Sequence, residues 1–145
     1  MRKLFNSYKR VIEFAISHEV KAYQLYMDLS KKMLLPGISE LCEELAKEEL
    51  EHKAKLEEES AKRCELASAV NTSKYRVLYS DVNIFKSRIE MFRFAVKKEQ
   101  ASAQLYQDLA AIVKNEDARQ MFQWLAQEET EHKRRFEKEY RNCLK

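Results

Sequence analysis

The sequence predicts an all-α fold, a bundle of four long helices, and three observations support this prediction. The 145 residues include one glycine and one proline, which leaves almost none of the turn chemistry that a β-rich fold needs. Charged residues make up 35% of the chain, and glutamate, lysine, alanine and leucine are prominent, which is typical of long amphipathic helices. The third observation is an internal repeat, which gives two copies of a two-helix unit.

The repeat relates the two halves of the chain by a shift of 80 residues, without gaps across two stretches. The segment FAISHEVKAYQLYMDLS at 14–30 matches FAVKKEQASAQLYQDLA at 94–110. The segment LAKEELEHK at 45–53 matches LAQEETEHK at 125–133. Each half therefore contributes two helical segments, and the two halves together give four helices.

Apolar periodicity and turn signals place the four helices along the chain. Pro36 and Gly37 end the first helix, and Asn115 is a good N-cap followed by two acidic residues. The links within each half are short, so each pair of helices should form an antiparallel hairpin. A long connection between the hairpins fits a crossover along the bundle, which is the ferritin-like topology. We expect one domain over 1–145, repeat halves at about 7–66 and 81–145, helices at about 7–33, 39 to the mid-60s, 81–114 and 115 to the C-terminus, and a crossover at about 67–80.

Polar residues interrupt the apolar stripe of every helix at matching positions. A glutamate takes an apolar position in the first and third helices, and a glutamate and a histidine three residues apart do so in the second and fourth. Four buried carboxylates are too costly unless something neutralises them. Two divalent cations balance four glutamates, and each histidine adds one neutral ligand, so the pattern predicts a two-metal site. The predicted ligands are Glu19, Glu49, His52, Glu99, Glu129 and His132.

A solvated helix face explains a single Glu-x-x-His pair, but it does not explain two copies in register, each paired with a glutamate on the preceding helix. Glu48 and Glu128 also precede the histidines, at a spacing of four residues. Glu48 shares its arc of the helix with other charged residues, whereas Glu49 lies between Leu45 and Leu56. Helical phase therefore favours Glu49 and Glu129 over their neighbours.

Other residues near this pattern carry weaker signals. Tyr26 and Tyr106 lie two turns after Glu19 and Glu99 on the same faces, where each hydroxyl could contact a ligating carboxylate or could simply belong to the core. His18 falls off the apolar stripe, so we expect it at the surface. Trp124 matches Glu44 in the repeat and should pack on a flank or an interface. No role is assigned to the cysteines, which are Cys42, Cys64 and Cys143.

Composition excludes several classes of protein. The net charge is +3 and basic residues alternate with glutamate, so the sequence indicates no nucleic-acid partner. No segment has the apolar length of a signal peptide or a membrane span. The three cysteines are far apart and form no CxxC pair, which favours a reducing compartment. We expect a soluble, cytoplasmic protein.

Two pairs of motifs resemble the rubrerythrin-like branch of the ferritin-like superfamily: Glu19-x-x-Ala-x-x-x-Tyr26 with Glu49-x-x-His52, and Glu99-x-x-Ser-x-x-x-Tyr106 with Glu129-x-x-His132. The resemblance covers nearly the whole chain outside the crossover. It implies a non-haem site of two iron ions that reacts with hydrogen peroxide or dioxygen, with electrons from a rubredoxin-type donor. It also implies pairing of chains, so we expect a homodimer. Tyr26 and Tyr106 would orient carboxylates and supply a hydrogen bond to bound peroxide.

The sequence departs from this family at two points. The cysteine pairs of a rubredoxin domain are missing, so the electron donor must be a separate protein. Rubrerythrins carry a further glutamate three residues after the ligand of the third helix, and here that position is Ser102. Oxygen-rich ligands with one imidazole per metal suit iron or manganese, and zinc could bind adventitiously. Besides a peroxide-reducing oxidoreductase, the pattern allows a ferroxidase or iron-storage protein, and a non-catalytic, metal-stabilised interaction module.

Overall fold

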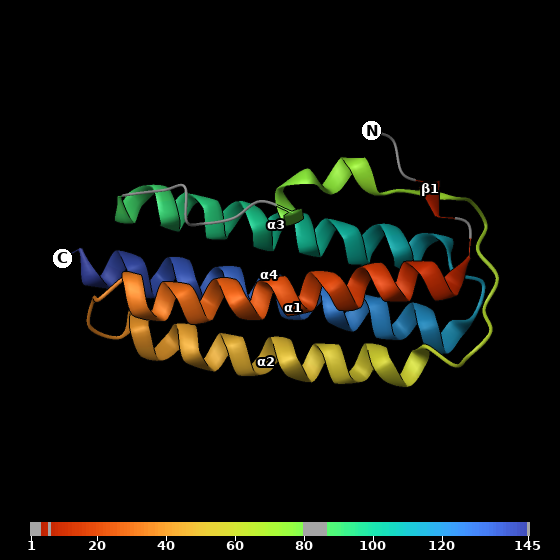
Figure 1. Cartoon of the computed structure of the whole chain (residues 1–145), viewed down its shortest axis with the longest axis horizontal. Helices are drawn as coiled ribbons and strands as arrows, with labels where there is room; N and C mark the ends of the chain where they lie inside the picture. Colours follow the sequence, from red (N-terminus) through yellow and green to blue (C-terminus); the bar gives the residue numbers. More distant parts are fainter. Residues whose placement is uncertain (1–3, 6, 80–86, 145) are drawn as a thin grey trace.

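A computed structural model of the chain describes residues 4–5, 7–79 and 87–144. The long helices of the described part pack lengthwise into a bundle, which confirms the predicted all-α class (Figure 1). α1 and α2 form one antiparallel hairpin, and α3 and α4 form the other. The helices are α1 (Tyr8–Lys32), α2 (Ile38–Glu59), α3 (Arg88–Ile112) and α4 (Glu116–Cys143).

Polar caps define where three of these helices begin. The side chain of Ser7 accepts a hydrogen bond from the backbone N–H of Arg10 at the start of α1. Ser87 caps α3 in the same way, and Asn115 caps α4, as its sequence context indicates. Gly37 precedes α2 with φ of +83°, a left-handed conformation that L side chains rarely adopt. These caps and the left-handed turn fix both hairpins.

Two helix boundaries differ from the sequence-based expectation. α2 ends at Glu59 and not in the mid-60s, because residues 65–67 instead pair with the end of α3: the N–H of Ala67 donates to Ile112 O at 2.7 Å. α3 begins at Arg88 and not near 81, and residues 81–86 lie outside the described residues.

The crossover contains more structure than its weak periodicity indicates. A two-residue strand, β2 (Val70–Asn71), pairs antiparallel with β1 (Leu4–Phe5). The 3-10 helix η1 (Thr72–Tyr79) follows and lies along α3 (Figure 1). Tyr75 in η1 is buried and donates a hydrogen bond to Asp108 of α3. These contacts bind the crossover to the outside of the bundle.

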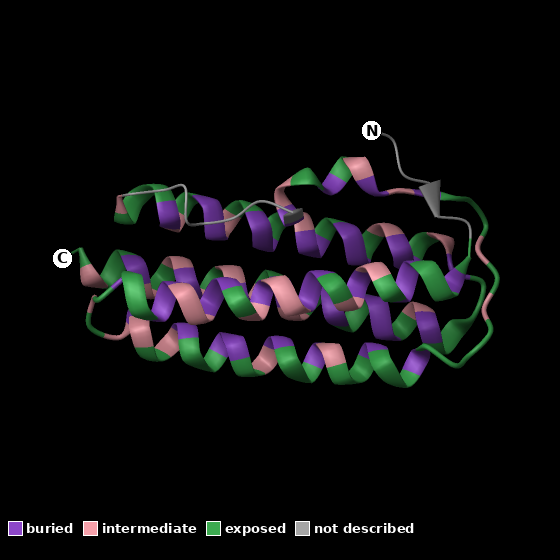
Figure 2. Cartoon of the chain, in the orientation of Figure 1, coloured by how far each residue is buried: buried purple, intermediate pink, exposed green. Residues whose placement is uncertain are grey.

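Buried residues recur along the length of each long helix, with exposed residues between them (Figure 2). Two apolar clusters fill the interior, one containing Ile12, Leu105 and Phe122, and the other containing Leu29 and Phe136. Charged and polar side chains are buried as well, and several of them form the site described below. Within the described residues, no helix combines the length and the apolar composition that a membrane span requires.

Candidate metal centre

The bundle brings the six predicted ligand residues together in its interior. Each side chain comes from a helix position on the buried stripe, and each residue is at most 3% exposed. α1 and α3 supply one glutamate each, and α2 and α4 supply a glutamate and a histidine each. The six residues are Glu19, Glu49, His52, Glu99, Glu129 and His132.

The six residues divide into two overlapping groups of four. Glu19 and His52 form one group with Glu49 and Glu129, and Glu99 and His132 form the other with the same two glutamates. Within each group, one oxygen or nitrogen atom from every residue lies within 4.8 Å of the others. Glu49 and Glu129 are therefore placed between two positions, each of which has one further glutamate and one histidine. This is the arrangement that two neighbouring cations with shared carboxylates require.

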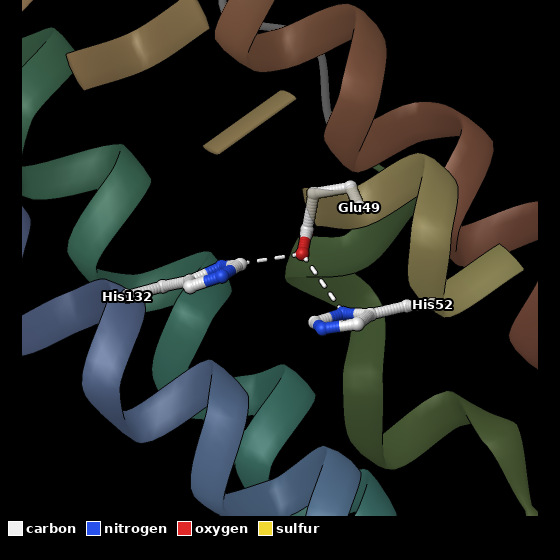
Figure 3. Close-up of side chains that lie close together, drawn as sticks. All are labelled: Glu49, His52 and His132. Carbon is white, nitrogen blue, oxygen red and sulfur yellow. Dashed lines mark ion pairs between the residues drawn. The ribbon is translucent and has the colours of Figure 1, made fainter. Parts of the chain in front are cut away.

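Glu49 reaches both histidines from the middle of the site. Its Oε1 atom lies 3.1 Å from Nδ1 of His52 and 3.2 Å from Nδ1 of His132 (Figure 3). The two imidazole rings are stacked, with centroids 5.4 Å apart. Glu129 also approaches Nδ1 of His52, at 2.9 Å. The Nδ1 atoms of both histidines thus face the buried carboxylates of the six-residue cluster, while their Nε2 atoms point away from it.

Several buried atoms of this site have no hydrogen-bond partner among the described residues. They belong to four glutamates and one histidine, and buried polar atoms are otherwise nearly always partnered. Because these atoms converge, divalent cations placed among them would satisfy several at once. The residues therefore fit a two-metal site. The atoms are Glu19 Oε2, Glu49 Oε1 and Oε2, Glu99 Oε2, Glu129 Oε2 and His132 Nδ1.

Burial favours the protonated form of three of the four carboxylates in this site. Burial raises the pKa of Glu129 to about 8 and also raises the pKa values of Glu49 and Glu99. Burial alone would lower the pKa of His132, but its close contacts with the carboxylates of Glu48 and Glu49 outweigh burial and raise that pKa to about 12. The metal-free site is thus a cluster in which protonation offsets the repulsion between carboxylates.

Tyr26 and Tyr106 connect the two repeat halves at this site. Tyr26 of α1 donates to Oε1 of Glu99 on α3, and Tyr106 of α3 donates to Oε1 of Glu19 on α1, both at 2.5 Å. Burial, and then the charge of the nearby glutamates, raises the pKa of each hydroxyl well above its usual value, so both remain protonated donors. Each tyrosine holds one oxygen of a glutamate and leaves Oε2 facing the interior.

Comparison with known proteins identifies the family and agrees with the fold. The family model of rubrerythrin matches residues 10–140. The chain belongs to the rubrerythrin family. Its fold is similar to that of a hypothetical protein from Pyrococcus furiosus, with a TM-score of 0.69 and 22% sequence identity over 94% of this chain and 89% of the other. No functionally curated protein matches the chain significantly.

Ser102, at the position where rubrerythrins carry a further glutamate, is buried against a histidine. The expectation that His18 lies at the surface is wrong: it is 4% exposed, and its Nε2 atom lies 2.6 Å from Oγ of Ser102 and 4.0 Å from Oε1 of Glu19. Side chains of α1 contact α3 as well as α2, so the buried face of α1 is wider than a single stripe. Burial lowers the pKa of His18 to about 4, which keeps the imidazole neutral.

Glu48 and Glu128 contact the two histidines of the site, which helical phase did not indicate. Both are about a third exposed or less, as expected of a polar face. Each nevertheless reaches across to the outer nitrogen of a histidine: Glu48 lies 3.3 Å from Nε2 of His132, and Glu128 lies 3.5 Å from Nε2 of His52. In the sequence, the spacing of four residues before each histidine was the signal that could have indicated these contacts. Each contact, however, joins α2 to α4, and not two residues of one helix.

Trp124 occupies the flank that its sequence context indicates. The side chain is 40% exposed, and its ring meets the His52 ring edge-on, with centroids 5.5 Å apart. Nζ of Lys55 lies 5.8 Å from the centre of the indole ring. Trp124 thus covers part of the outer side of His52.

Proposed function

We propose that this chain is a non-haem di-iron oxidoreductase that reduces hydrogen peroxide, or dioxygen, with electrons from a separate donor. The observation that carries the proposal is the buried layer of four glutamates and two histidines, in which unpartnered atoms converge on two positions. Membership of the rubrerythrin family supports iron as the metal. Rubrerythrin-like relatives lead us to propose a rubredoxin-type donor protein, a homodimer and a cytoplasmic location.

The donor set suits iron for chemical reasons. Carboxylate oxygens with one imidazole per metal favour iron or manganese over softer metals. Glu49 and Glu129 would be shared between the metals, while Glu19 and Glu99 would each hold one. When bound, two ferrous ions supply the two electrons that, with two protons, convert hydrogen peroxide to two waters, and the external donor then restores the electrons.

The surrounding residues fix the ligands before any metal arrives. The tyrosine hydrogen bonds to Glu19 and Glu99 aim Oε2 of each glutamate at the interior. We propose that Tyr26 or Tyr106 can turn its single hydroxyl proton from its glutamate to bound oxidant, because both hydroxyls stay protonated. The low exposure of the whole site favours a small oxidant over a bulky substrate.

Rapid mixing under anaerobic conditions tests this proposal. Protein loaded with two equivalents of Fe(II) should give the absorption of a ferric pair within seconds of adding one equivalent of hydrogen peroxide, and dioxygen should react more slowly. Added reductant should then sustain peroxide turnover, and Glu129→Ala should abolish it. Uptake of Fe(II) well beyond two per chain without peroxide turnover would replace the proposal with a ferroxidase or storage function. Failure to react with either oxidant would favour a non-catalytic module.

A further inference from the structure

The two halves of the metal centre have matching ligands but different supports on their outer sides. The repeat relates Glu48 to Glu128, and both contact the outer nitrogen of a histidine. The neighbouring positions do not match. Arg135 corresponds to Lys55, and Glu44 corresponds to Trp124.

On the His132 side, an arginine holds the supporting carboxylate. Nη1 of Arg135 donates to both oxygens of Glu48, at 3.1 and 2.9 Å, and its Nη2 donates to Oε2 of Glu44 at 3.1 Å. The two hydrogen bonds from Nη1 of Arg135 therefore hold Glu48, whose Oε1 atom lies 3.3 Å from Nε2 of His132.

On the His52 side, the corresponding carboxylate has no such support. Among the described residues, no lysine or arginine lies within ion-pair distance of Glu128, whose contact to Nε2 of His52 is 3.5 Å long. Lys55 lies over the ring of Trp124 instead. Within the described part of the chain, this 3.5 Å contact is the interaction that holds Glu128, so its position is less constrained than that of Glu48.

This difference affects the orientation of the two histidine rings and the charge around each of them. A carboxylate that holds the outer N–H of a ligating histidine fixes the ring and raises its basicity, and loss of such a partner typically costs about 10- to 100-fold in metal affinity. The His132 side also has two carboxylates against one guanidinium, whereas the His52 side has one carboxylate and one ammonium. Exposure of Glu44 screens the extra charge, so geometry contributes more. Both effects favour a cation beside His132.

We propose that the two metal positions are unequal: the position of Glu99 and His132 binds first and tightly, and the position of Glu19 and His52 is the exchangeable one. Arg135 and Glu48 are then positioning residues, since they act on the metal through His132. This inference rests on the metal site of the proposed function.

Calorimetric titration of the metal-free protein with Co(II) tests the inference without any assay of activity. The wild-type protein should bind two Co(II) ions in two resolved steps. The two dissociation constants should differ by more than the statistical factor expected of two identical sites. Arg135→Lys keeps the charge but removes the planar fork, so it should weaken the tight step by about tenfold and leave the weak step nearly unchanged. His132→Ala should abolish the tight step, and His52→Ala should abolish the weak one.

The repeat also allows the reverse experiment. Lys55→Arg combined with Trp124→Glu places the Arg135 and Glu44 residue types beside Glu128, and this double variant should tighten the weak step. Melting of the metal-free variants with the wild-type transition would show that the fold is intact. Two indistinguishable steps in the wild-type protein, or loss of the weak step in His132→Ala, would overturn the inference. Binding of no Co(II) at all would instead overturn the proposed metal site.

Discussion

Replacing Glu49 with leucine should stabilise the metal-free protein and abolish its response to metal. Glu49 is fully buried, neither carboxylate oxygen has a hydrogen-bond partner among the described residues, and three further glutamates surround it. Glu49→Leu removes this carboxylate and fills its volume with an apolar side chain. The two histidines lose one nearby carboxylate, but Glu129 still contacts His52 and Glu48 still contacts His132.

The expected size of the effect follows from the burial of the charge. Replacing buried ionic groups by apolar ones of similar volume is often stabilising by about 1–4 kcal/mol. The loss of contacts to both imidazoles offsets part of this gain, so we expect about 1–2 kcal/mol, a rise in melting temperature of about 2–8 °C for a chain of this length. In the wild-type protein, metal at 100 times its Kd should add about 2.7 kcal/mol per site, a gain that the variant should lose.

Melting curves by circular dichroism, recorded with chelator and with Co(II), provide the measurement. Glu51→Leu is a matched control, because Glu51 lies on the exposed face of the same helix and its replacement should change neither curve by much. The reasoning is refuted if metal-free Glu49→Leu melts below the wild-type protein, or if Co(II) raises its melting temperature as much as that of the wild type.

Three further predictions test other parts of the site. Glu129→Ala should abolish binding of at least one metal ion, whereas Glu128→Ala should weaken metal binding by about tenfold through His52. Calorimetry measures both effects. A larger loss of metal binding in Glu128→Ala than in Glu129→Ala would show that the helical phase is wrong. Without metal, the free energy of unfolding should fall as pH rises from about 5 to 8. The pKa of Glu129 is raised from 4.5 to about 8 and that of His132 from 6.5 to about 12, so both groups bind protons more tightly in the folded state than in the unfolded state. Melting curves across this pH range check the sign, and added metal should reverse the trend because metal displaces the protons. Ser102→Glu restores the carboxylate that rubrerythrins carry and should change the rate of oxidation by hydrogen peroxide more than by dioxygen, which stopped-flow absorption would show; equal changes would contradict a role for that position.

The fold and the six clustered residues could be predicted because both follow from local rules. An α-helix makes one turn every 3.6 residues, so positions three, four and seven apart lie on the same face. A glutamate at such a spacing from leucines before and after it must therefore face the interior. The duplicated pattern then placed Glu19, Glu49 and His52 in register with their counterparts in the second half. That these residues bind metal is a proposal for the experiments above.

The remaining features depend on how helices lie against one another, which periodicity does not contain. His18 is buried because α1 faces both α2 and α3, and no single stripe describes such a helix. Contacts from Glu48 to His132 and Arg135 depend on the register between α2 and α4. The early end of α2 depends on pairing of residues 65–67 with the end of α3, almost 50 residues further along the chain.

We expect the six buried side chains to hold two metal ions per chain. Elemental analysis of protein reconstituted with Fe(II) under anaerobic conditions and freed of excess metal tests it most directly. We predict about two iron ions per chain in the wild-type protein and about one or fewer in His52→Ala and in His132→Ala, because each variant removes a ligand of one position. Fewer than one iron per wild-type chain, or equal amounts in the wild type and both variants, would contradict the account.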